Sequence, residues 1–101
     1  MPAANASYST MANILALIRW KGVKMNLEAP GPHHEPPPAH ELAGIKRGLF
    51  CRLKADDNYF WVMATGKQAG VIFGIVESSF PGGPERGSRV AFTKYNVFEV
   101  I

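Results

Sequence analysis

Residues 59–77 read YFWVMATGKQAGVIFGIVE and decide the fold. The runs 59–65 and 71–77 are rich in aromatic and β-branched side chains, which strands favour, and both are short for a helix. The residues from Gly66 to Gly70 that separate them are typical of a hairpin connection. Gly74, inside the second run, predicts a bulge or a close backbone approach, as a small sheet needs in order to curl. The stretch therefore predicts a central β-hairpin.

Shorter strands are expected on both sides of this hairpin. Residues 49–54 alternate apolar and charged side chains and are followed by a turn cluster, Asp-Asp-Asn, at 56–58. Residues 89–93 alternate again, and residues 97–101 give a last strand after a short turn. The pattern predicts an all-β domain over 42–101, a small five-stranded SH3-like barrel. An OB-type barrel is the alternative, although it usually needs more residues and a helix between strands.

The side-chain period of two along a strand divides the apolar residues between two faces of the sheet. The predicted core face consists of Phe60, Val62, Ile72, Val76, Val90 and Phe92. The other face then carries Tyr59, Trp61, Met63 and Phe73. Unless an N-terminal helix covers them, side chains of this kind mark an interaction site or a surface for self-association.

The first 41 residues divide into two segments. Residues 1–24 predict either a short helix, with Thr10 as N-cap and Gly22 as its end, or a translated leader. The leader hypothesis rests on residues 20–25, which can be back-translated to the purine run of a bacterial ribosome-binding site just before Met25. Residues 25–41 are rich in proline and histidine and predict a flexible linker with little apolar content to bury.

Few residues in the chain suggest catalysis or metal binding. Cys51 is the single cysteine and lies on the predicted core side of its strand, and no histidine follows His40. His33, His34, Glu35, His40 and Glu41 have ligand chemistry, but a proline-rich segment offers no scaffold to hold a metal. We therefore expect no catalytic residues, metal, cofactor or small-molecule substrate, and hence no enzyme.

Composition limits the partners and the compartment. The net charge is +3, from 11 Lys and Arg against 8 Asp and Glu, which is not the dense basic stripe of most phosphate-tracking surfaces. The apolar run 13–18 is far shorter than the about 20 residues that span a bilayer, and no basic residue precedes it as in a secretory signal. A cytoplasmic protein without a membrane contact is the simplest interpretation.

Four segments of the domain resemble a family of small bacterial and phage proteins. They are residues 59–62 (YFWV), 70–76 (GVIFGIV), 87–92 (GSRVAF) and 96–100 (NVFEV). Family members carry an aromatic-Phe-Trp-Val strand, a Gly-x-Ile-x-Gly-x-Val strand, a Gly-Asp-x-Val-x-Phe strand and a closing hydrophobic strand. Most are catalogued as a domain of unknown function, so the resemblance implies a small β-barrel of a bacterium or mobile element and no activity.

Two functions remain from this reasoning. The first is a non-enzymatic protein-interaction or adaptor module that uses the apolar face of Tyr59, Trp61, Met63 and Phe73. The alternative is a weak nucleic-acid binder in which Arg52, Lys54, Arg89 and Lys94 hold phosphates while neighbouring rings stack on bases. The two differ in salt dependence, because phosphate contacts weaken steeply as salt rises and apolar contacts do not.

Overall fold

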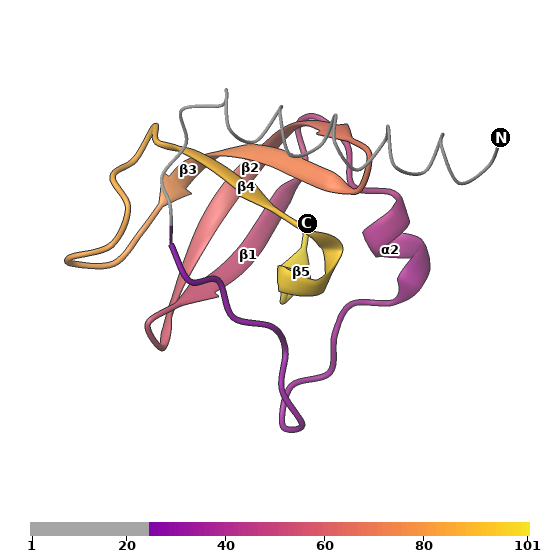
Figure 1. The fold of residues 1–101 in the computed structure, drawn as a ribbon, viewed down its shortest axis with the longest axis horizontal. Coiled ribbons are helices and arrows are strands. Elements are labelled where there is room, and N and C mark those ends of the chain that lie inside the picture. Colours follow the sequence, from indigo (N-terminus) through magenta and orange to yellow (C-terminus); the bar gives the residue numbers. More distant parts are fainter. Residues whose placement is uncertain (1–24) are drawn as a thin grey trace, which may run out of the picture.

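The computed structural model describes residues 25–101, so the predicted helix or leader at 1–24 lies outside the described residues. Within the described residues the elements are, in order, α2 (Ala39–Ala43), β1 (Phe50–Ala55), β2 (Asn58–Gln68), β3 (Val71–Ser78), β4 (Arg89–Phe92), the 3-10 turn η1 (Lys94–Asn96) and β5 (Glu99–Val100). The strands form one antiparallel sheet in the order β4-β3-β2-β1-β5 (Figure 1). The prediction of a small all-β domain is confirmed.

The β1–β2 and β2–β3 hairpins each close through a two-residue turn. Asp56 and Asp57 join β1 to β2 with φ of 48° and 64°, and Ala69 and Gly70 join β2 to β3 with φ of 48° and 87°. Positive φ at both central positions is the signature of a type I′ turn, whose twist matches that of the flanking strands. The second hairpin was predicted to connect through 66–70, but β2 continues to Gln68 and only two residues turn the chain.

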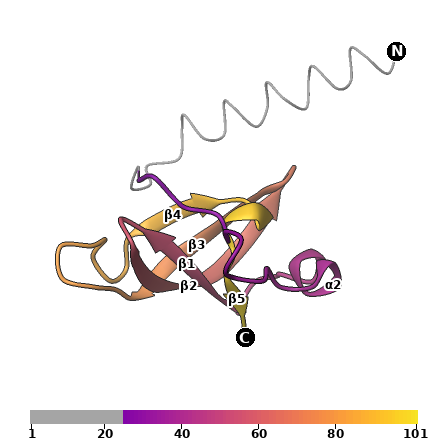
Figure 2. The ribbon, with the colours of Figure 1, turned by 90° about the horizontal axis from the view of Figure 1, so that it is seen from below.

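Gly74 is the close approach that the sequence predicts. A Cβ atom on Gly74 would lie 2.9 Å from the carbonyl oxygen of Met63 on the neighbouring strand. The register shifts beside it, since Ala64 pairs with Gly74 and Gly66 pairs with Phe73, which leaves Thr65 as an extra residue. A bulge of this kind bends its strand and increases the twist, and Figure 2 shows the strands strongly twisted.

The core lies on one side of this twisted sheet. All six predicted core residues are buried, together with Cys51, Leu53 and Ala64 from the same side of β1 and β2. Ile45, before β1, and Val97, before β5, complete the cluster. Phe80 from the loop after β3 packs against it and meets the Phe60 ring edge-on at 6.2 Å.

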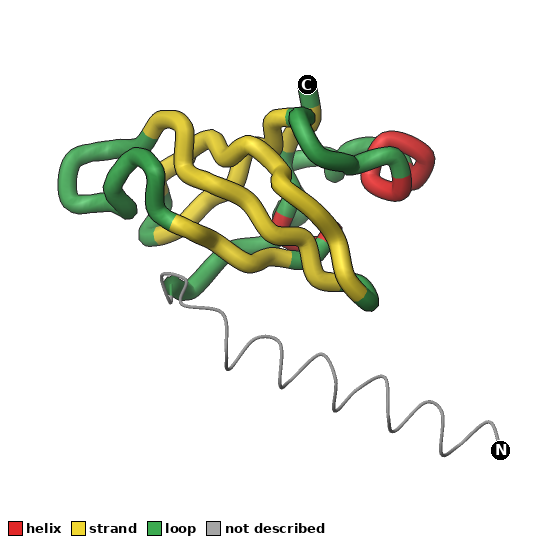
Figure 3. Tube along the Cα trace, turned by 90° about the horizontal axis from the view of Figure 1, so that it is seen from above, coloured by secondary structure: helices red, strands yellow, loops and turns green. Residues whose placement is uncertain are grey.

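Two expected features differ from the structure. The last strand, predicted at 97–101, is β5 with only two residues, although backbone hydrogen bonds to β1 also involve Phe98 and Ile101. The helix α2 was not predicted, since it follows three consecutive prolines and has only five residues. It lies at one end of the molecule, beside the strands and not over them (Figure 3).

Residues 25–38, here called the strap, pass the edge of β1 at Leu27 and Glu28 and then continue to α2 (Figure 1). Leu27 bridges Ala55, and the amide of Glu28 donates to the carbonyl of Lys54 at 2.9 Å. The same edge is paired further along by β5, at Cys51 and Arg52. Strap and β5 therefore share the edge of β1. Sequence reasoning treated 25–41 as a linker and did not anticipate these contacts.

Candidate functional site

The face of the sheet opposite the core, here called the outer face, carries the first set of predicted site residues. It is formed by Phe50, Arg52, Lys54, Tyr59, Trp61, Met63, Phe73, Ile75 and Arg89. Met63 lies at its centre, paired with Phe50 on one side and Ile75 on the other. The apolar side chains that strap and α2 bring to the sheet, from Met25, Leu27 and Leu42, pack against the core instead.

The structure brings three of the four predicted apolar residues together. Trp61, Met63 and Phe73 are half-buried residues of one face on the adjacent strands β2 and β3. Phe50 and Ile75 extend the patch and were missed by sequence reasoning, although their strand positions share the parity of Arg52 and Phe73. The resulting apolar patch is defined here as Phe50, Trp61, Met63, Phe73 and Ile75.

Tyr59, the fourth predicted apolar residue, belongs to a different cluster. Its ring meets Phe98 edge-on at 5.4 Å between centroids, and the Arg52 guanidinium carbon lies 4.4 Å from its centroid. The Lys54 ammonium lies 5.2 Å from the same centroid. Tyr59 is still 41% exposed. It therefore serves as a platform for two cations of its own chain at the end of the sheet near Asp57.

The same two cations also have carboxylate partners. Arg52 Nε lies 3.4 Å from Glu99 Oε2 across the β1–β5 pair, and Lys54 Nζ lies 3.4 Å from Asp57 Oδ1. A cation paired in this way attracts an external phosphate less strongly, because the partner carboxylate repels the same phosphate. Both were predicted as phosphate contacts in the nucleic-acid alternative, and both are engaged within the chain.

The other two predicted phosphate contacts lie apart from each other. Arg89 is exposed on β4, opposite Ile75 at the far edge of the outer face. Lys94 is exposed in η1, with its ammonium 5.2 Å from the Tyr95 ring centroid. Arg52 and Lys54 lie together beside Tyr59, whereas Arg89 and Lys94 lie on β4 and in η1, so the four predicted cations do not form one stripe along the sheet.

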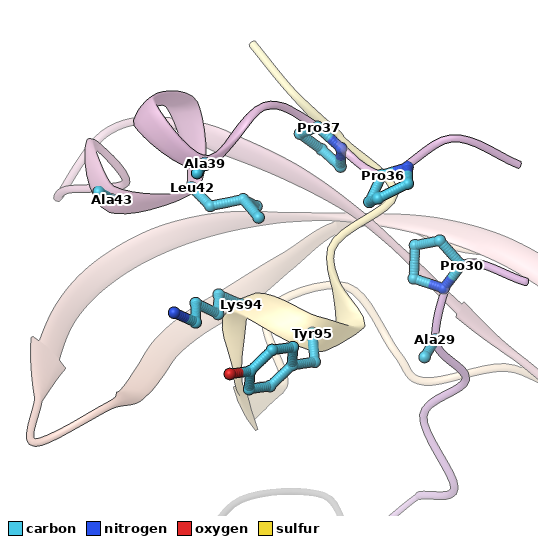
Figure 4. A pocket seen from close by; sticks show the side chains of 9 residues that line it. All are labelled: Ala29, Pro30, Pro36, Pro37, Ala39, Leu42, Ala43, Lys94 and Tyr95. Atoms are coloured by element: carbon cyan, nitrogen blue, oxygen red, sulfur yellow. The ribbon is translucent and has the colours of Figure 1, made fainter.

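A groove between strap, α2 and η1 was not predicted. Its volume is about 450 Å³, and its wall includes Pro30, Pro36, Pro37, Leu42, Lys94 and Tyr95. Figure 4 shows Leu42 reaching from α2 toward the space beside η1, with the proline rings on the strap side. A second compartment of about 530 Å³ shares Leu42, Lys94 and Tyr95 and continues toward the β2–β3 turn. Sequence reasoning missed the groove because it left the prolines in solvent.

The residues with potential catalytic chemistry are placed as follows. Cys51 is fully buried, and desolvation by burial raises the pKa of its thiol to about 11, which suppresses the thiolate. His34 bonds the carbonyl of Phe98 through Nε2 at 3.2 Å and packs on its ring at 5.1 Å. His34 thus anchors the strap. Within residues 25–101, no three His, Cys, Asp or Glu side chains gather in a way that could hold a metal ion.

The described part of the chain has no helix with the length and apolar character that crossing a membrane requires. Two surfaces of the described residues are candidates for binding: the apolar patch on the outer face and the proline-walled groove beside η1. Comparison with protein-family models, with curated proteins and with solved structures found no match to this chain.

Proposed function

We propose that the protein is a non-enzymatic interaction module that binds a protein partner, or a second copy of itself, through the apolar patch of its outer face. The observation that carries this proposal is the position of Trp61 and Met63 at the centre of that face, with Phe50 and Ile75 beside them on both neighbouring strands. Large apolar side chains gathered on one sheet face are typical of interaction sites.

The sheet itself suits such a role. Its order, in which a three-strand meander is flanked by β4 on one edge and by a returning β5 on the other, agrees with an SH3-like barrel. The 3-10 turn η1 immediately before the last strand agrees with it too. We propose this fold and, from the resemblance of its strands, a place among small bacterial and phage proteins that act in the cytoplasm.

Nucleic-acid binding is the weaker candidate. Arg52 and Lys54, which lie on the outer face, each have a carboxylate partner 3.4 Å away. Arg89 is the remaining predicted cation of this face and is exposed on β4, but a single arginine gives a small electrostatic gain, since affinity for a phosphate backbone grows with the number of phosphates contacted.

The test uses the wild type and two variants of the full chain as bait in an extract of the source cells. The wild type should retain a protein partner at about 0.1 M and at about 1 M salt, because apolar contacts survive screening. Trp61→Ala combined with Met63→Ala should lose that partner. Glu85→Ala, which removes an exposed side chain outside both the patch and the groove beside η1, is the control and should keep it.

Light scattering of the same variants reports self-association, the other form of the proposal. A wild-type dimer that the double substitution converts to a monomer would support it. Binding of a labelled single strand that disappears at high salt and requires Arg52 and Arg89, with no effect of the double substitution, would instead establish the nucleic-acid alternative. Thermal melts of each variant ensure that lost binding is not lost folding.

A further inference from the structure

The groove beside η1 is independent of the outer face, and its walls are fixed. Glu28 holds the start of the strap, since its carboxylate Oε2 accepts from the Asp57 amide at 2.9 Å and its carbonyl accepts from Asn96 Nδ2 at 3.4 Å. His34 holds the strap again at Phe98. The wall between these anchors and α2 contains prolines, whose φ is fixed by the ring. A preformed wall loses little conformational entropy when a ligand binds.

Opposite the prolines, the groove presents an apolar floor with positive charge at its rim. Leu42 and Tyr95 belong to both compartments, and Tyr95 is 69% exposed. The exposed Lys67 ammonium donates to the Ala43 carbonyl at 3.0 Å, which uses one of its three N–H groups and leaves two for a ligand. Lys94 reaches along the Tyr95 ring. Two ammonium groups therefore flank an apolar surface.

The charged side chains that line the two compartments are all positive among the described residues. Lys67 and Lys94 line the two compartments, and no aspartate or glutamate is among the described residues that line either of them. Glu35 and Glu41 lie near in sequence, on the strap and α2, but are not part of the lining. A ligand that fills the groove must therefore match a positive rim, and an anionic group is the complement.

We propose that this groove binds a short extended peptide that combines aliphatic side chains with carboxylates. The aliphatic groups fill the space between Leu42, the prolines and Tyr95, while glutamate or aspartate side chains meet Lys94 and Lys67. A single-stranded nucleic acid fits less well, because stacking needs a ring for each base and Tyr95 is the one aromatic residue of the described lining.

The chain's own first 24 residues do not match the groove. They contain Arg19, Lys21 and Lys24 and no aspartate or glutamate, so they carry the same sign of charge as the rim. The complementary partner is therefore a separate acidic peptide.

The test titrates the isotope-labelled full chain with a fluorescent peptide, Gly-Leu-Glu-Pro-Leu-Glu-Gly, and follows backbone amide shifts and anisotropy. Amides of Leu42, Ala43, Lys94 and Tyr95 should shift, and those of Trp61 and Met63 should not. Replacing both glutamates of the peptide by lysine should abolish binding.

Two variants and one control complete the design. Lys94→Glu should weaken binding about tenfold or more, the scale of one lost charged contact, and Tyr95→Ala should weaken it by removing the apolar floor. Lys46→Glu changes an exposed lysine outside the lining and should leave affinity unchanged. Equal affinity of wild type and Lys94→Glu, shifts confined to the outer face, or absence of binding would overturn the proposal. So would a synthetic peptide of residues 1–24 shifting the groove amides in place of the acidic one.

Discussion

Cys51 illustrates how one side chain is fixed by its place on a strand. It alternates with Phe50 and Arg52 along β1, faces the core and is fully buried. Burial in apolar surroundings raises the pKa of the thiol from 9.0 to about 11, because the thiolate loses its hydration. The sequence pattern alone predicted this inert role, since Cys51 alternates along the strand in step with Leu49 and Leu53 and therefore shares their side of the sheet.

The raised pKa has a consequence for stability in alkali. In the unfolded chain the thiol ionises near 9, whereas in the folded chain it stays protonated until about 11. Its contribution is complete below pH 9 and is lost as pH rises through 11, by about 1.4 kcal/mol per pH unit within that window. Urea unfolding at several pH values should therefore show a steeper decline for the wild type than for Cys51→Ala, which has no thiol to titrate. Parallel declines would contradict the assignment.

Arg52, Lys54 and Tyr59 show which property of single residues the sequence could not predict, namely their contacts within the fold. Strand parity correctly put all three on the outer face. Alternation along a strand does not identify the ion-pair partners of a side chain, however. Arg52 pairs with Glu99 of the last strand, and Lys54 pairs with Asp57 of a turn. Such pairing forms only in the complete fold, and sequence reasoning therefore proposed these cations as phosphate contacts of a nucleic acid.

At the scale of elements, the central hairpin depends on Gly74. Replacing it with alanine places a Cβ atom 2.9 Å from the Met63 carbonyl oxygen, a backbone atom that cannot move without disturbing the ladder. Gly74→Ala should destabilise the protein by about 1–3 kcal/mol. Gly66→Ala is the matched control, because it lies in the same hairpin with open space within 4 Å and no positive φ. Thermal unfolding of both variants decides the matter: a Gly74→Ala midpoint equal to that of Gly66→Ala would exclude the close approach.

The elements divide into those that local sequence determines and those that tertiary contacts determine. The first four strands were predicted within a few residues because alternation and turn residues specify them locally. The fifth strand was also predicted, at 97–101, but β5 spans only Glu99–Val100. The helix α2 was not predicted, since an element of five residues carries little periodicity of its own. Their positions depend on the β1 edge and on the strap.

At the scale of the molecule, the groove was invisible in the sequence for the same reason. Its walls come from segments separated by more than fifty residues, Pro36 of the strap and Tyr95 of η1. Proline-rich composition suggested extended backbone, although the strap also contains a turn in which the His34 amide donates to the Gly31 carbonyl at 3.1 Å. It could not show that Glu28 and His34 attach this backbone to Asp57 and Phe98.

The strap makes residues 25–101, and not 42–101, the expected folding unit. A chain that begins at Leu42 loses the Glu28 bonds to Lys54 and Asp57 and the packing of Met25 and Leu27 against the core. Two half-buried side chains and a few hydrogen bonds together stabilise the fold by about 3 kcal/mol, a large part of the margin of a small domain.

Urea unfolding of chains 25–101 and 42–101 should show a much lower midpoint for the shorter one, or its failure to fold. Within the longer chain, Glu28→Ala should remove about 1 kcal/mol and speed hydrogen exchange at the Asp57 amide, which donates to the Glu28 carboxylate. Equal midpoints for the two chains would mean that the strap is not part of the fold, and the groove it walls would then lose its basis as well.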